Sequence, residues 1–168
     1  EFRKKYGDDG NLLVIGVQIP NLFQQNIFND YLSLARSLKS VHGVTDVISL
    51  ASAVNLVRAE NAEKLQAIPV FGGQSLSQPQ IDSSRNIFFS LPFYKGLLYN
   101  PETNAWLMGV HIDASVLNSP QRTAVVGSII DSCDHFGKAH QVEMHLSGLP
   151  LIRTVIADRI QKEMRWFL

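Results

Sequence analysis

The stretch LLVIGVQI at residues 12–19 decides how the rest of this chain is arranged. It is apolar on both faces that a strand presents, and only Gly16 and Gln18 interrupt it. Such a run is typical of a strand in the middle of a sheet that helices cover. Pro20 and Asn21 follow at once and end the run. The stretch therefore predicts a central strand, on which the neighbouring elements build.

A helix and a second strand are predicted directly after this strand. Asn21 is a suitable N-cap, and Gln24 three residues later completes the start signal. The helix is expected to end at His42 and Gly43, and residues 44–50 then form the second strand. One face of the helix would be buried, and it carries Phe28, Tyr31, Ala35 and Leu38.

The same order of elements returns in the second half of the chain. Residues 104–113 have the pattern of a third strand, and residues 141–147 alternate as a fourth. Between them, Ser119 and Pro120 open a second helix, and Gly137 is the expected cap at its end. The buried face of this helix would carry Val126, Ile129, Ile130, Cys133 and Phe136.

Strand, helix, strand, repeated once, is the pattern of an α+β fold, the ferredoxin-like βαββαβ sandwich. In such a fold, two helices pack on one face of a four-stranded antiparallel sheet. The chain, 1–168, is predicted to be a single domain whose core covers about 11–51 and 104–147. An insertion at about 52–103 separates the second and third strands, and a C-terminal helix covers 149–168.

The insertion is too long for a bare loop in a compact domain, so it is expected to have structure of its own. Residues 59–65 and 83–91 are predicted to be short helices, the second ended by Pro92. Residues 71–75, FGGQS, have the composition of a flexible turn.

The overall composition excludes several classes of protein. Hydrophobic residues make up 45% of the chain and the formal net charge is zero, which is typical of a globular fold and offers no basic surface to a nucleic acid. Cys133 is the only cysteine, so no intrachain disulfide is expected. The sequence contains no run of 18 apolar residues, which a membrane-spanning helix would need.

The C-terminal helix is predicted from an apolar stripe that continues to the last residue. Its members recur every four residues, at Ile152, Ile156, Ile160, Met164 and Leu168. No glycine or asparagine caps the helix, so we expect it to lead into a membrane helix. We expect Ile152, Val155 and Ile156 to pack on the domain. Met164, Phe167 and Leu168 would then lead away from it.

Three segments resemble one family of membrane transporters. Residues 2–9, FRKKYGDD, are similar to the start of the first extracytoplasmic loop in resistance-nodulation-division (RND) exporters, most of all in their MMPL-like branch. Residues 148–152, GLPLI, resemble the Gly-x-Pro-x-Ile stretch that opens the helix leading into the second membrane helix. Residues 92–100, PFYKGLLYN, resemble the link into the third strand of the loop domain.

The resemblance implies a porter-type domain that stands outside the membrane and is not an enzyme. Such a domain helps to capture and pass a hydrophobic or amphiphilic molecule or lipid in a proton-driven exporter of the inner membrane, on its periplasmic side. Its partners would be that substrate and the remainder of the same transporter, namely the membrane helices and a second loop domain. A homo-oligomer is a further option, and no cofactor is expected.

Aromatic side chains concentrate in the insertion and in the strand that follows it. A cleft lined by them would hold a lipid-like molecule. Phe71, Phe93, Tyr94 and Tyr99 neighbour glycines or turns, so they are the candidates for the substrate path. The alternative is a small packed core that joins the insertion to the sheet. Its members would include Phe88, Phe89 and Trp106.

Residues that bind metals or act as nucleophiles have simpler explanations. Cys133 lies on the apolar stripe of the second helix, which predicts an inert buried thiol. No nucleophile elbow or phosphate-binding loop is present. Imidazole and carboxylate groups suit zinc or copper, but their spacing here fits no compact motif, so no metal site is predicted. These groups belong to Asp131, Asp134, His135, His140 and His145.

Two other functions are consistent with the same pattern of elements. Accessory subunits of bacterial protein export share the topology, and their partner is an emerging polypeptide. A soluble ferredoxin-like regulatory module would instead bind a small ligand between two such units. Apolar segments of about 20 residues on both sides of the chain would favour the exporter. A polar linker or an attached enzyme domain would favour the regulator.

Overall fold

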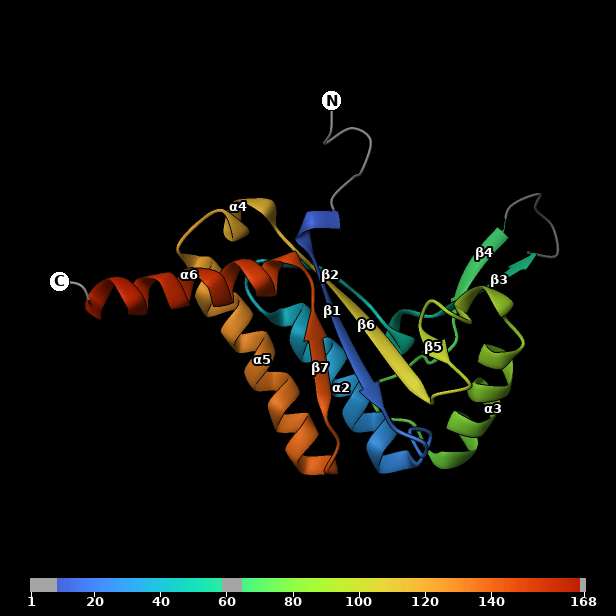
Figure 1. Ribbon diagram of the computed structural model, residues 1–168. Helices are drawn as coiled ribbons and strands as arrows, with labels where there is room; N and C mark the ends of the chain where they lie inside the picture. The colour runs from blue at the N-terminus through green and yellow to red at the C-terminus, as the bar shows by residue number, and fades with distance from the viewer. Residues whose placement is uncertain (1–8, 59–64, 167–168) are drawn as a thin grey trace.

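The computed structural model describes residues 9–58 and 65–166, which form an α+β fold with an antiparallel sheet packed against helices (Figure 1). The sheet contains β1 (Leu12–Gln18), β2 (Val44–Ile48), β6 (Ala105–Ile112) and β7 (Met144–Ser147) in the order β2-β6-β1-β7. The short strand β5 (Tyr99–Asn100) also pairs with β6. All of these pairings are antiparallel. The predicted succession of strands and helices in the core is therefore correct.

Strand β1 lies between β6 and β7, as its apolar sequence predicts. Ile15 stands opposite Met108 on one side and Leu146 on the other. Burial alternates along β1: Ile15 is buried under the helices, whereas Leu12 and Val14 on the opposite face are only half-buried. The expectation that both faces of this strand are covered is therefore only half met.

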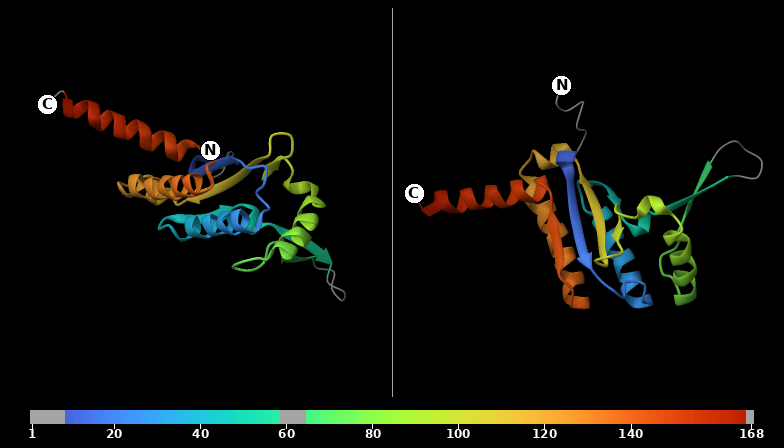
Figure 2. Two further views of the ribbon diagram at one scale, coloured as in Figure 1. Left: turned by 90° about the horizontal axis from the view of Figure 1, so that it is seen from below. Right: turned by 45° about the vertical axis from the view of Figure 1, so that its right-hand side comes forward.

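Two long helices, α2 (Gln25–Ser40) and α5 (Gln121–His140), lie side by side on one face of the sheet (Figure 2). The short helix α4 (Ala114–Leu117) precedes α5. The N-cap of α2 is Gln24, three residues later than the expected N-cap Asn21. Asn21 instead donates a hydrogen bond from Nδ2 to Gln24 Oε1 (3.2 Å) in the turn before the helix. Both helices bury the faces that their apolar residues predict.

Gly137 does not end α5, which corrects the expected position of its cap. The helix continues to His140, and Gln141 ends it in the left-handed conformation with φ of 54°. Gly137 is buried against the chain that leads into β7, where an added Cβ would stand 2.8 Å from the carbonyl oxygen of Val142. The glycine therefore allows helix and strand to approach closely, and this requirement mimics the signature of a helix end.

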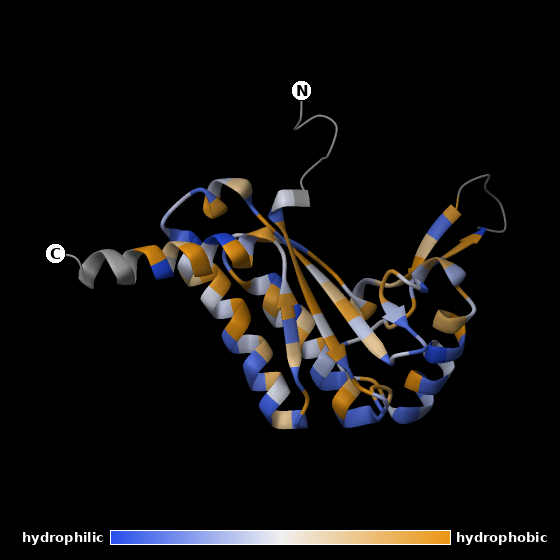
Figure 3. Cartoon of the chain, in the orientation of Figure 1, coloured by the Kyte–Doolittle hydropathy of each residue, from blue (hydrophilic) through white to orange (hydrophobic). Residues whose placement is uncertain are grey.

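The insertion between β2 and β6 has more regular structure than the sequence predicts. After the 3-10 turn η2 (Leu50–Ser52), strands β3 (Val54–Arg58) and β4 (Leu65–Pro69) form a separate antiparallel ribbon. Helix α3 (Gln78–Phe89) and the 3-10 turn η3 (Pro92–Tyr94) follow. Most of the short helix expected at 59–65 lies outside the described residues, and Leu65 itself begins β4. Figure 3 shows hydrophobic residues on this ribbon, which stands away from the sheet.

Helix α3 begins earlier than the expected residue 83 because a start signal precedes it. Gln80 Oε1 accepts a hydrogen bond from the backbone N–H of Ser77 (2.9 Å), which is half of a capping box. Pro79 stands within the first turn, where its missing N–H costs nothing. Serine, glutamine and proline at these spacings are a recognisable N-terminus.

Helix α6 (Leu149–Trp166) leaves the sheet directly after β7 and projects away from the body of the domain (Figures 1 and 2). Gly148 makes the turn into α6 with φ of 122°. An added Cβ at this position would stand 2.5 Å from the carbonyl oxygen of Leu12, so only glycine fits without displacement. The start of α6 therefore lies directly against the start of β1.

The expected packing of the C-terminal stripe is wrong. Ile152, Val155 and Ile156 are 50%, 47% and 51% exposed, and Ile160 is equally exposed. The turn before the helix directs a different side of it, with the buried residue Thr154, toward the domain. The expectation for Met164, Phe167 and Leu168 concerns side chains outside the described part of the chain. No described helix is both long and apolar enough to span a bilayer.

Candidate functional site

The aromatic side chains of the insertion form one continuous cluster with those of the sheet and of the segment before α2. Tyr99 stacks on Trp106 with ring centroids 5.4 Å apart, and Phe88 stacks on Tyr94 at 5.2 Å. Phe71 joins the insertion to α2, because its ring lies 4.9 Å from that of Phe28. The aromatic cluster consists of Phe23, Phe28, Phe71, Phe88, Phe89, Tyr94, Tyr99 and Trp106.

The four candidates for a substrate path occupy two different environments. Phe71, Tyr94 and Tyr99 are buried within the aromatic cluster. Phe93 is 74% exposed and rests edge-on against Tyr94, with centroids 5.3 Å apart. The three buried rings have the arrangement of a packed core, which is the alternative interpretation of this region. Phe93 is thus the candidate that a molecule in solution can reach.

The Tyr94 hydroxyl attaches the β3–β4 ribbon to the aromatic cluster. It accepts a hydrogen bond from the backbone N–H of Val54 (2.8 Å) and donates one to the carbonyl oxygen of the same residue (2.9 Å). Val54 is the first residue of β3, so the base of the ribbon is held while its outer part extends. Leu56, Leu65 and Ile68 on this ribbon are exposed. The sequence contains no local signal for this contact, which joins residues 40 positions apart.

Reciprocal side-chain hydrogen bonds dock the insertion onto α2. Asn29 donates from Nδ2 to the carbonyl oxygen of Leu76 and accepts from the backbone N–H of the same residue, both at 2.8 Å. Gln25 and Gln78 exchange similar bonds, because each backbone N–H donates to the other side chain's Oε1 at 2.9 and 3.1 Å. These bonds position α3 beside α2 and fix the edge of the aromatic cluster.

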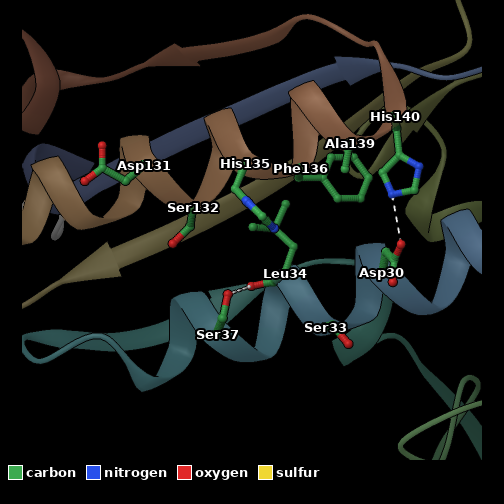
Figure 4. A pocket seen from close by; sticks show the side chains of 10 residues that line it. All are labelled: Asp30, Ser33, Leu34, Ser37, Asp131, Ser132, His135, Phe136, Ala139 and His140. Carbon is green, nitrogen blue, oxygen red and sulfur yellow. Dashed lines mark hydrogen bonds and ion pairs between the residues drawn. The ribbon is translucent and has the colours of Figure 1, made fainter.

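A second candidate site is a groove between α2 and α5, on the side of these helices that faces away from the sheet (Figure 4). Its volume is about 530 Å³, within the range of small-molecule sites. The α2 wall carries Asp30, Ser33, Leu34 and Ser37, which recur at helical spacing and so share one face. Leu34 is buried and belongs to the floor, whereas the polar side chains stand at the rim.

The α5 wall of the groove combines an apolar floor with polar ends. Phe136 is buried and contributes to the floor, with Ala139 beside it. Asp131 lies toward one end and His140 at the other. His140 Nε2 lies 3.0 Å from Asp30 Oδ2, an ion-pair distance, although the ring N–H is poorly aligned for a hydrogen bond. This contact joins the two helices at one end of the groove.

The residues that suggested a metal site do not converge. Asp131, His135 and His140 line the groove, but Asp134 lies on another side of α5. His145, on β7, lies 3.8 Å from the carboxylate of Glu143, which precedes the strand. Within residues 9–58 and 65–166, no group of three or more histidine, cysteine, aspartate or glutamate side chains is arranged to hold a metal ion.

Tyr31 on α2 and Cys133 on α5 are buried side chains with ionisable groups. Burial raises the pKa of the Cys133 thiol to about 12, and the nearby Asp134 carboxylate adds to the shift. Burial likewise raises the pKa of Tyr31, whose hydroxyl has no hydrogen-bond partner among the described residues. A thiol that remains protonated is a poor nucleophile, which agrees with the inert role expected for Cys133.

Comparison of the sequence with models of known protein families and with curated proteins finds no match.

Proposed function

We propose that this chain is a porter-type domain of a proton-driven exporter of the RND superfamily, MMPL-like branch, with a ferredoxin-like core. The strand order supports the fold. In a βαββαβ sandwich the first strand lies between the third and the fourth, and the second strand is at an edge. The order β2-β6-β1-β7 has this arrangement when the insertion is set aside, with α2 and α5 as the two helical connections.

The observation that carries the proposal is the position of the two ends of the domain. Gly148, at the start of α6, lies against Leu12 at the start of β1. The chain therefore enters and leaves the sheet at one corner (Figure 1). A loop domain held between two neighbouring membrane helices requires this arrangement, because both of its connections must return to the same surface.

The exposed apolar surfaces support a role as part of a larger protein on the extracytoplasmic side of the inner membrane. Ile152, Val155 and Ile156 on α6 are half-exposed, and the face of β1 opposite the helices is incompletely covered. Monomeric proteins rarely leave contiguous apolar surface in water. In the proposed transporter, the membrane helices and the second loop domain would cover these residues.

The insertion would contribute to the path of a hydrophobic or amphiphilic substrate. Phe93 is reachable from solvent, and the buried rings of Tyr94, Phe71 and Tyr99 would support it from beneath. Leu56 is a further exposed apolar side chain, on the ribbon whose first residue is bonded to Tyr94. In this role the domain receives the molecule, while the energy for transport is supplied elsewhere in the protein.

The decisive test is to read the coding sequence on both sides of residues 1–168. The proposal expects an apolar segment of about 20 residues on each side, long enough to span a bilayer. A polar linker or an attached enzyme domain on both sides would contradict it. In an exporter so identified, Phe93→Ser should lower export of an amphiphilic dye, whereas Phe93→Leu, which keeps an apolar side chain at the same exposed position, serves as the matched control.

A small-ligand regulatory module is the second candidate, and the groove between α2 and α5 favours it. A groove of about 530 Å³ with an apolar floor is large enough for a metabolite. The flanking sequence separates this candidate from the exporter, because a regulator would be joined to a polar linker or an enzyme domain. Protein-export accessory subunits would share the flanking membrane helices, and they would be distinguished by binding to an unfolded polypeptide.

A further inference from the structure

The groove between α2 and α5 exists because short side chains face each other across it. Ser37 on α2 and Ser132 on α5 point toward one another across it, and Ser33 and Ala139 also line it (Figure 4). Packed helices normally fill this space by placing larger side chains of one helix between those of the other. Here the small residues leave a hollow that runs along both helices.

The hollow combines an apolar floor with acidic ends. Leu34 and Phe136, both buried, form the floor. Asp131 and Asp30 contribute the carboxylates, and no lysine or arginine is among the ten residues that line the groove. The other polar groups are serine hydroxyls and the imidazoles of His135 and His140. An elongated ligand with positive charge complements this lining.

The two carboxylates lie at opposite ends of the groove. Asp30 is next to His140, and nine residues of α5 separate His140 from Asp131. With a rise of 1.5 Å per residue, the two ends of the groove are therefore about 13 Å apart along the axis of α5. The contact with His140 uses Oδ2 of Asp30 and leaves its side chain 60% exposed, so a ligand can still approach this carboxylate.

We propose that the groove between α2 and α5 binds a linear aliphatic diamine or polyamine. One ammonium group contacts the Asp131 carboxylate, the methylene chain lies over Leu34 and Phe136, and the second ammonium group contacts Asp30. Serine hydroxyls at the rim accept the remaining N–H bonds. Charge at both ends gives orientation and specificity, while the apolar floor removes the chain from water. The proposal is independent of the exporter assignment, because it rests on a different face of the domain.

The test is a calorimetric titration of the chain at pH 8 with 1,8-diaminooctane. Octylamine and 1,8-octanediol are the matched ligands, since they keep the chain length and remove one or both charges. We expect the diamine to bind most tightly, octylamine several times more weakly, and the diol not measurably. Equal binding of the diamine and the diol, or no binding of the diamine, would overturn the proposal.

Two variants show whether binding occurs in this groove. Asp131→Asn should weaken diamine binding about threefold to tenfold, the loss expected for one partly exposed charge contact. Asp134→Asn removes the same charge from α5 outside the groove, and should change the affinity less than twofold. An equal loss in both variants would show attraction by overall charge alone and would overturn the site. Ser37→Leu, at an exposed position that points toward α5, should abolish binding by filling the hollow, with an unchanged circular dichroism spectrum.

Discussion

Helices α5 and α6 have similar apolar stripes in the sequence, but the stripe of α5 is mostly buried and that of α6 is half-exposed. In α5, Ile129 and Cys133 of the stripe are completely buried. In α6 the stripe that includes Ile152 and Ile156 is half-exposed. The difference is positional, since α5 connects two strands of the sheet and α6 is attached only at its first turns. An apolar period therefore predicts a helix, but the attachment of its two ends decides which face is covered.

The largest expected contrast between the two helices is in thiol chemistry. With a pKa of about 12 in place of 9.0, Cys133 on α5 has about a thousandfold less thiolate than an ordinary cysteine. We expect a disulfide reagent at pH 8 to label it only on unfolding. Ile156→Cys on α6, made in a Cys133→Ser chain, should be labelled immediately.

The same shift in pKa makes stability depend on pH in a defined direction. The thiol loses its proton near pH 9 in the unfolded chain and near pH 12 in the folded one. The free energy of unfolding should thus fall as the pH rises above 9, and this contribution should disappear in Cys133→Ser. Labelling of Cys133 at the same rate as the cysteine on α6 would show that the buried face of α5 is accessible to the reagent in the folded chain.

The second contrast is in stability. Ile129→Ala leaves a cavity beneath α5, and should lower the free energy of unfolding by about 2–5 kcal/mol. Ile156→Ala on α6 removes a side chain that is half in water already, and should change it by no more than about 0.5 kcal/mol. Urea denaturation followed by circular dichroism measures both. Similar losses in the two variants would mean that α6 is packed against the isolated domain.

The smallest contrast lies within α5, between its two glycines, Gly127 and Gly137. An added Cβ at Gly127 would meet no atom within 4 Å, so Gly127→Ala should stabilise the helix by about 0.5–1 kcal/mol. At Gly137 the same methyl group would stand 2.8 Å from Val142 O, and the variant should lose about 1–3 kcal/mol. Thermal unfolding of the pair is the measurement. Equal stabilisation would show that the contact with Val142 does not require glycine at this position.

The sequence predicts the core of this fold well because its elements are long and buried. Residues 12–19 differ from β1 by a single residue, and the third strand and α5 are found in the same way. The sequence does not predict the β3–β4 ribbon, because its strands are short and do not pack on the core. Neither strand therefore shows a clear alternation of apolar and polar residues. The direction of α6 was also missed, since it depends on one close contact between Gly148 and Leu12.

The candidate sites show a similar limit. Aromatic residues in the insertion marked the region that joins it to the sheet, but sequence proximity to a glycine did not separate exposed Phe93 from buried Phe71 and Tyr99. The sequence does not predict the groove, because the groove depends on small side chains at positions of two helices that face each other only in the folded chain. Such a match involves Ser37 and Ser132, which are far apart in the chain, and no local pattern reports it.

The turn at Gly148 gives α6 the mechanical character of a lever. The helix has 18 residues, so it extends about 27 Å from a pivot that touches the central strand. For a helix of about 27 Å, a tilt of about 10° at the pivot would move the far end of α6 by about 5 Å. Conversely, a displacement of several ångströms at the far end reaches β1 as a small rotation beside Leu12. A movement of α6 is therefore passed to the central strand at Gly148, because the backbones of the two segments are in close contact there.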